Sequence, residues 1–252
     1  MLLLEYILLF ILGIIFGSFI SAVSWRIPNG MSFVRGRSVC PNCRNNIRWY
    51  DNIPLLSYLV LGGKCRKCKE KISIRYPAIE LATGLGFPAI LYFIDVTGVI
   101  TLVYILLMFL ILLTIFIIDL EHQIIPDSLV FLGLFITLIY SLSINNYSLF
   151  IILFSGFLGA SFLMFIHLIT RGKGMGLGDV KFAVLGGMIM NLKLLPLWLL
   201  LSFLTGAIAG IILILSGKAK MKTKIAFGPF LILGIVLTFA FGNNIMNLLG
   251  LT

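Results

Sequence analysis

The sequence predicts an all-α polytopic membrane protein of about eight transmembrane helices, with a small cytoplasmic zinc-binding loop domain between the first two helices. Three observations lead to this prediction. The 252 residues are 60% hydrophobic and only 11% charged, which is far from the composition of a soluble domain. Most apolar residues fall in runs long enough to cross a bilayer. All four cysteines lie in the one long polar stretch between such runs.

The first apolar run extends from Leu2 to Val23. It predicts a retained helix and not a removed signal peptide, because no basic segment precedes it and it lacks a small-residue cleavage site. A run over 78–94 is weakened by Pro88, and one over 180–192 covers only about 20 Å of a hydrocarbon core of about 30 Å. The other predicted crossings are 99–118, 128–143, 149–169, 195–216 and 230–250.

The basic residues follow the positive-inside rule if all eight runs cross the membrane. The loop 24–77 holds eleven of the 19 Lys and Arg residues, and we expect it to be cytoplasmic. Only Lys193 then falls on the other side, and both termini lie outside the cytoplasm. Seven of the nine acidic residues share the cytoplasmic side, so any active site is expected to face the cytoplasm. The remaining basic residues on that side are Arg171, Lys173, Lys181, Lys218, Lys220, Lys222 and Lys224.

These runs divide the chain into three expected domains: the first transmembrane helix over 1–23, the cytoplasmic loop domain over 24–77 and a membrane-embedded domain over 78–252. A loop of about 50 residues is too short to fold reliably on apolar burial alone. We therefore expect the loop domain to be held together by some other interaction.

The cysteines form two pairs, Cys40-Pro-Asn-Cys43 and Cys65-Arg-Lys-Cys68, separated by 21 residues. This spacing is typical of a zinc site with four thiolate ligands, and a closed tetrahedral shell makes the zinc structural. The alternatives are two disulfides or free thiols, but the cytoplasm is kept reducing. The basic residues around the cysteines resemble the nucleic-acid patch of some zinc ribbons. We expect anionic lipid headgroups and no nucleic acid as their partners, or simply solubility and topology.

Two aspartates lie at predicted bilayer edges. Asp119 follows the apolar run from Val99 to Ile118, and Asp179 ends the glycine-rich segment that begins at Gly174. Ionisable groups at such positions are usually functional. Two carboxyl groups that share a proton supply an acid and a base, as in aspartic proteases. A helix N-cap for Asp179 and a plain interfacial residue for Asp119 are the structural alternatives.

Other residues are expected to be structural. Gly13-x-x-x-Gly17 and Gly206-x-x-x-Gly210 predict close contacts between helices. His167, inside the run 149–169, is expected to be a hydrogen-bonded interior residue and not a ligand.

Several different short motifs lie along the chain, each at one place. They are Gly17-Ser18-Phe19 with Arg26-Ile-Pro28, the cysteine pairs, Asp51-Asn-Ile-Pro54 with Ser57-Tyr58, Ile74-Arg-Tyr-Pro77 with Glu80, Ile118-Asp119 with Ile125-Pro-Asp127, Gly176-Leu-Gly-Asp179-Val-Lys181 and Phe227-Gly-Pro229. With these motifs the chain resembles the type IV prepilin peptidase/N-methyltransferase family over nearly its whole length. One departure is Phe19-Ile-Ser21, where family members often carry Phe-Leu-Asn. The resemblance implies that Asp119 and Asp179 are the catalytic pair of an aspartic peptidase domain over 78–252.

The resemblance also implies the reaction. A multi-pass protein of the bacterial inner membrane would cleave the leader of type IV prepilin-like proteins at the cytoplasmic face. It would then N-methylate the new N-terminus with S-adenosylmethionine as methyl donor, although no motif indicates which residues bind that donor. A peptidase without methyl transfer is the alternative. An ion-coupled transporter predicts mid-membrane acids and repeated halves, and a non-enzymatic zinc module gives no reason for Gly-x-Gly-Asp. The oligomeric state and the choice of pilin-like substrate are not set by the sequence.

Overall fold

The computed structural model describes residues 2–32, 38–94, 96, 98–144, 148–218, 220 and 225–248. Its regular structure in these residues is helical, with two isolated β-bridges. Contacts between Cα atoms divide the chain into two units, Met1–Val96 and Thr97–Thr252, and each unit is described by itself. Four of the basic residues used in the topology prediction, Arg35, Arg37, Lys222 and Lys224, lie outside the described residues.

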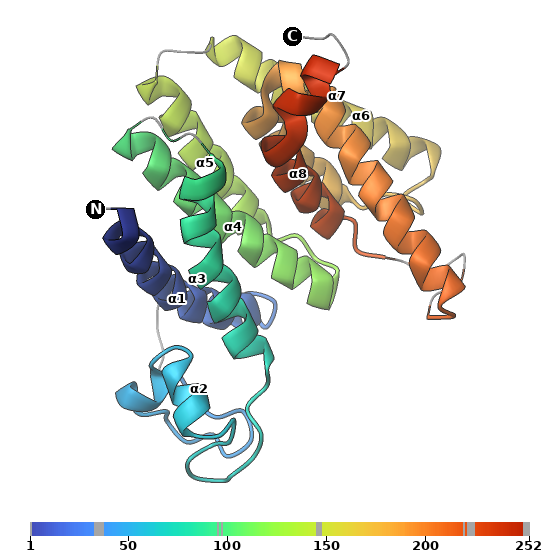
Figure 1. The fold of residues 1–252 in the computed structure, drawn as a ribbon. Coiled ribbons are helices and arrows are strands. Elements are labelled where there is room, and N and C mark those ends of the chain that lie inside the picture. The colour runs from blue at the N-terminus through green and yellow to red at the C-terminus, as the bar shows by residue number, and fades with distance from the viewer. Residues whose placement is uncertain are drawn as a thin grey trace. The chain divides into compact units, whose positions relative to one another are not determined.

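The first unit consists of two long helices and a polar loop region between them (Figure 1). Helix α1 spans Leu2–Arg26 and α3 spans Arg75–Phe93, and the two helices pack along each other. The loop region contains the short 3-10 helix η1 (Trp49–Asn52) and the short helix α2 (Leu56–Val60). The cysteine region thus lies between the first two long helices, as the sequence predicts.

Glycines allow the backbones of α1 and α3 to approach closely. A Cβ atom added to Gly13 would lie 2.5 Å from the carbonyl oxygen of Thr83, and one added to Gly17 would lie 2.7 Å from Cα of Glu80. Since real Cβ atoms do not approach backbone atoms this closely, only glycine fits at either position. The predicted contact of the first glycine motif is confirmed.

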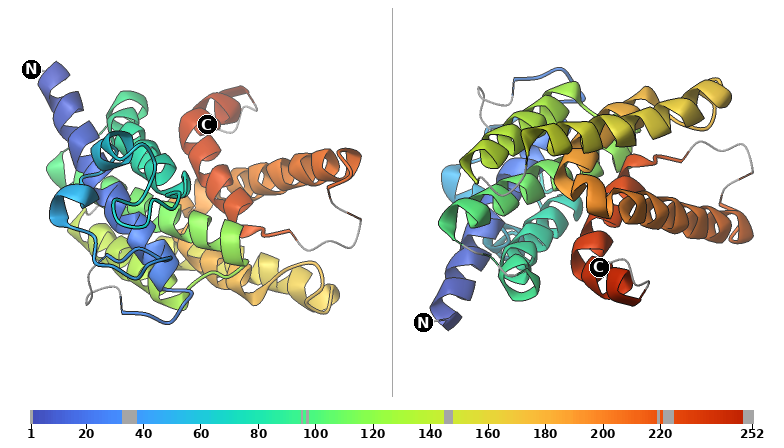
Figure 2. Two further views of the ribbon diagram at one scale, coloured as in Figure 1. Left: turned by 90° about the horizontal axis from the view of Figure 1, so that it is seen from below. Right: turned by 90° about the horizontal axis from the view of Figure 1, so that it is seen from above.

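The second unit contains the other five helices, and Figure 2 shows them from two further directions. Helices α4, α6 and α7, together with α1, are long and apolar enough to cross a membrane. Helices α5 and α8 contain shorter apolar stretches, and α3 belongs to neither group. The bounds are α4 Val99–His122, α5 Asp127–Ser143, α6 Leu149–Ile169, α7 Leu177–Leu215 and α8 Gly228–Leu248.

Helix α7 changes direction sharply at Asn191, whose φ of 57° and ψ of 171° are not helical. The buried Trp198 ring packs on Gly186, where an added Cβ atom would lie 2.3 Å from the ring. Twelve residues of straight helix span about 18 Å, which is beyond the reach of a tryptophan side chain, so the chain must turn back between these two residues. The break at Asn191 lies within the predicted crossing 180–192, near its end, and before the predicted crossing 195–216.

Trp198 also ties the second half of α7 to α8. Its indole N–H donates to the carbonyl oxygen of Leu231 at 2.9 Å. The first half of α7 packs on α6, where the Ser155 hydroxyl donates to the carbonyl oxygen of Gly187 at 2.8 Å. Helix α7 is thereby held on both sides, which fixes the position of its N-terminal turn.

Candidate active site and metal centre

Asp119 lies in the last turn of α4 and is 4% exposed. The helix ends at once after this turn, because Gln123 adopts the left-handed conformation and donates its N–H to the carbonyl oxygen of Asp119 at 2.9 Å. Among the described residues, Oδ2 of Asp119 is buried and has no hydrogen-bond partner. Buried polar atoms are nearly always paired, so this oxygen has capacity for a hydrogen bond from a water molecule or another donor.

Asp179 lies in the first turn of α7 and is 8% exposed. The residue that caps this helix is Gly176, not Asp179 as the structural alternative assumed. Asp179 sits three residues later, and its Oδ2 accepts the N–H of Gly176 at 3.1 Å. One carboxylate oxygen is thus held by the glycine-rich segment, which orients the side chain.

Two glycines beside the aspartates, Gly178 and Gly228, have a common neighbour in the side chain of Ile125. A Cβ atom added to Gly178, next to Asp179, would lie 3.3 Å from Cβ of Ile125. A Cβ atom added to Gly228, at the start of α8, would lie 3.0 Å from Cδ1 of Ile125 and 2.5 Å from Oδ2 of Asp119. The structure therefore brings together the two residues that the sequence singled out.

Two contacts that the sequence did not reveal position the glycine-rich segment. Nδ1 of His167, in α6, lies 2.7 Å from the carbonyl oxygen of Met175 in a hydrogen bond. On the other side of Asp179, Nζ of Lys181 lies 2.8 Å from both carboxylate oxygens of Asp127, the first residue of α5. The expectation that His167 is a hydrogen-bonded residue is confirmed.

The cysteine pairs of the first unit form two turns with the same backbone geometry. In the first, the N–H of Arg44 donates to the carbonyl oxygen of Cys40 at 2.9 Å, and Arg44 has a φ of 54°. In the second, the N–H of Lys69 donates to the carbonyl oxygen of Cys65 at 3.0 Å, and Lys69 has a φ of 60°. An isolated β-bridge closes each turn, Val39 with Asn46 and Lys64 with Lys71.

The two turns bring the four sulfur atoms into one cluster. The sulfur atoms of Cys40, Cys43, Cys65 and Cys68 all lie within 4.8 Å of one another, and none is in a disulfide. The distance between Cys40 Sγ and Cys68 Sγ is 3.8 Å. Four thiolates at about 2.3 Å from a tetrahedral zinc ion are about 3.8 Å apart, so the cluster fits such an ion.

Backbone groups around the cluster favour the deprotonated, thiolate form of at least one cysteine. The backbone N–H groups of Cys68 and Lys67 lower the pKa of the Cys65 thiol to about 6. A backbone N–H of Glu70 acts in the same direction on Cys68, but burial and hydrogen bonds with the other cysteines outweigh it and raise the pKa of Cys68 to about 11. A cation bound at this cluster would lie beside the negative charge of the Cys65 thiolate.

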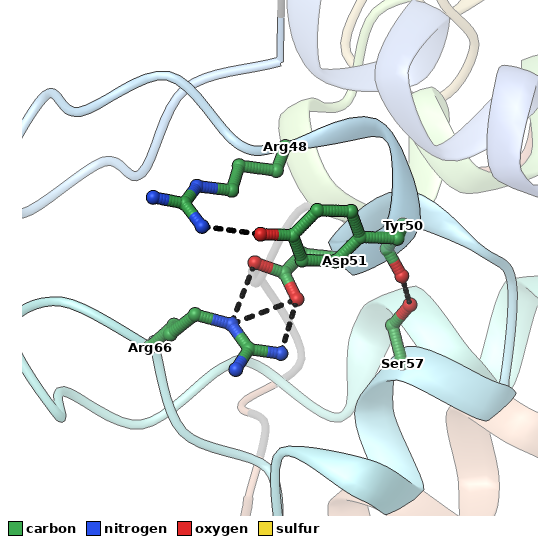
Figure 3. A network of polar contacts seen from close by, with 5 residues as sticks. All are labelled: Arg48, Tyr50, Asp51, Ser57 and Arg66. Carbon is green, nitrogen blue, oxygen red and sulfur yellow. Dashed lines mark hydrogen bonds and ion pairs between the residues drawn. The ribbon is translucent and has the colours of Figure 1, made fainter.

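One of the cysteine turns is joined to η1 by an ion pair (Figure 3). Arg66 lies within the second turn and donates from Nη2 to Oδ1 of Asp51 at 2.7 Å and from Nε to Oδ2 at 2.9 Å. The Asp51 side chain is only 9% exposed, and the hydrogen bond from Arg66 holds its pKa below the usual range. The spacing of the motifs gave no signal for this contact, because the two residues come from different motifs.

A second contact joins the loop region to α3. The buried carboxylate of Glu80 accepts the N–H of Leu55 at 2.8 Å. Leu55 has a φ of 58°, which is unusual for a leucine, and it immediately precedes α2. Arg75, at the start of α3, donates to the carbonyl oxygen of Ser21 at 3.1 Å and to the Ser24 hydroxyl at 2.8 Å.

Comparisons with known proteins identify the family of the chain. Residues 11–94 match the bacterial Peptidase A24 N-terminal domain, and residues 105–211 match the type IV leader peptidase family. The chain is 35% identical to a prepilin leader peptidase/N-methyltransferase of Pseudomonas aeruginosa, over 93% of this chain and 90% of the relative. It is 33% identical to the proteins of the same name from Bacillus subtilis, over 95% and 96%, and Vibrio cholerae, over 93% and 96%. No solved structure matches the chain. The chain therefore belongs to the prepilin leader peptidase/N-methyltransferase family, Peptidase A24, a family of bacterial membrane enzymes.

Proposed function

We propose that this protein removes the leader from type IV prepilin-like substrates, with Asp119 and Asp179 as the catalytic pair. The observation that carries the proposal is that two buried aspartates lie beside glycines that share Ile125 as a neighbour, and that Oδ2 of Asp119 has no hydrogen-bond partner among the described residues. A buried pair of this kind shares a proton, because two adjacent negative charges repel each other.

In the proposed reaction one carboxylate takes a proton from a water molecule while the water oxygen bonds to the carbon of the scissile carbonyl. The other carboxyl group, still protonated, donates a hydrogen bond to the carbonyl oxygen. The carbon–nitrogen bond then breaks, and the leaving nitrogen takes a proton from the pair. The products are a leader with a new carboxylate and a mature chain with a free N-terminal amine.

The second proposed activity is methylation of that amine, with S-adenosylmethionine as co-substrate. The co-substrate supplies a methyl group on a positively charged sulfur, so the neutral amine bonds to the methyl carbon as the carbon–sulfur bond breaks. The sulfur keeps the electron pair, and the methylated amine loses a proton to the solvent. Family membership supports this activity, since the relatives are named N-methyltransferases.

We further propose that Cys40, Cys43, Cys65 and Cys68 hold a structural zinc ion. The match between the sulfur separation and tetrahedral zinc–thiolate geometry supports this assignment. Four protein ligands leave no open position for a substrate, so the ion would stabilise the loop region and take no part in the chemistry.

The proposed topology has eight crossings, with the loop 24–77 and both aspartates at the cytoplasmic face of the bacterial inner membrane. Helix α7 would supply two of the crossings, since it turns back at Asn191. The lysines and arginines of the cysteine turns would lie near anionic lipid headgroups, where each contributes about 1 kcal/mol.

The test is to co-express a prepilin-like substrate with the wild type, Asp119→Asn or Asp179→Asn, and to follow the substrate by mass spectrometry. Each variant keeps the shape of the side chain but loses the acid or base, so we expect cleavage to slow by about 10² to 10⁴-fold. Glu5→Gln, which makes the same kind of change at an exposed carboxylate in the first turn of α1, is the matched control. Normal cleavage by either of the first two variants refutes the catalytic pair, and a wild-type product without an added methyl group limits the enzyme to proteolysis.

A further inference from the structure

A cavity of about 620 Å³ lies in the loop region of the first unit, beside η1. Pockets for molecules of the size of a nucleoside derivative usually measure about 300 to 1,000 Å³. Because a methyl donor is water-soluble, its site must be open to the aqueous phase, and this cavity is formed by the polar loop region and not by the long apolar helices. The lining residues are Ser38, Ile47, Arg48, Trp49, Tyr50 and Asn52.

The lining offers the groups that an adenosyl sulfonium needs. Trp49 is 81% exposed, and its ring stands edge-on to that of Tyr50 with 5.6 Å between centroids. An aromatic face binds adenine by stacking and a sulfonium by cation–π attraction. The guanidinium group of Arg48 suits the carboxylate of the methionine part. The side chains of Asn52 and Ser38 supply hydrogen-bonding groups for the sugar and the base.

A network of polar contacts holds this wall in place before any ligand arrives (Figure 3). Arg48 donates to the Tyr50 hydroxyl, and the Ser57 hydroxyl donates to the carbonyl oxygen of Tyr50 at 2.9 Å. The guanidinium carbons of Arg48 and Arg66 lie 5.8 Å and 5.6 Å from the centre of the Tyr50 ring. Asp51, between Tyr50 and Asn52 in the sequence, accepts three hydrogen bonds from Arg66.

Arg66 lies between two of the clustered cysteines, so the same ion pair ties the cavity wall to the second cysteine turn. A wall that is already ordered does not lose conformational freedom on binding, which favours affinity. The proposed metal would therefore act on the cavity from a distance, by fixing the turn from which Arg66 extends.

We propose that the cavity beside η1 is the binding site of the adenosyl methyl donor, and that the Asp51–Arg66 pair positions its wall. This inference rests on the proposed methyl transfer. It assigns to Trp49 the main contact with the donor, and it makes Asp51 and Arg66 positioning residues that do not touch the donor.

The experiment measures donor binding directly, without turnover. The full-length protein is purified in lipid nanodiscs, and binding of radiolabelled S-adenosylmethionine is followed by equilibrium dialysis. Loss of one stacking contact predicts at least about tenfold weaker binding for Trp49→Ala. Trp25→Ala, the same substitution in the last turns of α1, is the matched control and should bind as the wild type does. Asp51→Asn should bind more weakly while its zinc content is unchanged.

A second measurement needs no substitution. Ultraviolet light cross-links the bound radiolabelled donor to nearby side chains, and trypsin cuts after Arg48 and Lys64 to release the peptide 49–64. Label is expected in that peptide, and excess unlabelled donor should prevent the labelling.

The outcomes distinguish failure of the proposed donor site from failure of the proposed methyl transfer, on which this site rests. If the wild type binds the donor but Trp49→Ala binds equally well, or if the label is found elsewhere, this site is wrong and methyl transfer stands. If the wild type neither binds the donor nor methylates the cleaved substrate, the proposed methyl transfer itself fails.

Discussion

The backbone of Gly228 lies directly against the side chain of Asp119, so that a Cβ atom added to Gly228 would meet Oδ2 of Asp119 at 2.5 Å. Gly228→Ala must therefore move either the start of α8 or the carboxyl group. A displacement of about 1 Å in an active site can lower the rate about 10²-fold, and we expect a loss of this size in leader cleavage. Gly210→Ala is the matched control, since an added Cβ atom there meets nothing within 4 Å. Equal cleavage by the two variants would show that Asp119 tolerates the shift.

His167 is predicted to act through its ring nitrogen, which holds the carbonyl oxygen of Met175. His167→Phe keeps a ring beside Gly172 but removes the hydrogen bond, whose net contribution is about 1 kcal/mol. We expect both His167→Phe and His167→Ala to slow cleavage about fivefold, in assays of purified enzyme with a prepilin peptide. Full activity of His167→Phe would assign the residue to packing alone.

The ion pair between Lys181 and Asp127 should contribute little to stability, because both side chains are more than half exposed. Exposed pairs of this kind typically contribute about 0.2 to 1 kcal/mol. Asp127→Lys and Lys181→Asp each place like charges together, and we expect lower thermal stability for each than for the wild type. The double variant restores an opposite pair and should regain most of the loss. Additive losses in the double variant would argue against a specific pair.

Gly17 is predicted to tolerate no side chain. An added Cβ atom would lie 2.7 Å from Cα of Glu80, and the backbone of a packed helix cannot move away from it at low cost. Gly17→Leu should destabilise the first unit by about 1 to 3 kcal/mol or more, measured as a lower midpoint of thermal unfolding in detergent. Leu8→Phe enlarges an exposed position of the same helix and should leave the midpoint unchanged.

Removal of the proposed zinc ion is expected to loosen both cysteine turns. After treatment with a strong chelator, trypsin should cut rapidly at the basic residues beside the cysteines, among them Arg44 and Lys69. Added zinc should restore the protection in the wild type but not in Cys65→Ser, which lacks a ligand. Equal proteolysis with and without zinc would refute a structural role for the ion.

Much of this architecture could be predicted from the sequence, because its signals are local. Apolar runs gave the positions of the helices, the spacing of the cysteines gave their cluster, and Gly13 and Gly17 gave the contact between α1 and α3. Of the two glycines in the Gly206-x-x-x-Gly210 motif, only Gly206 makes the close contact that the motif predicts. An added Cβ atom at Gly206 would lie 3.2 Å from Phe227, whereas Gly210 meets no neighbour among the described residues.

What the sequence could not supply depends on contacts between distant segments. Nothing in the local pattern indicates that Ile125 lies beside both Gly178 and Gly228, or that Arg66 reaches Asp51. A long charged side chain has many conformations, so its partner is decided by the fold around it. The resemblance named both aspartates, but the shared neighbour of the glycines beside them and the unpaired oxygen of Asp119 emerge only from the three-dimensional arrangement.

The two cysteine turns stand at the ends of a 21-residue connection, and a metal ion between them would make that connection a closed loop. The entropy of closing a loop rises slowly with its length, by about 0.6 kcal/mol for each doubling. Insertions or deletions between Cys43 and Cys65 would then cost little stability as long as both turns remain. The connection also carries Trp49 and Tyr50 of the cavity wall and Asp51, which holds Arg66, so tolerance to changes in length is expected only outside these residues.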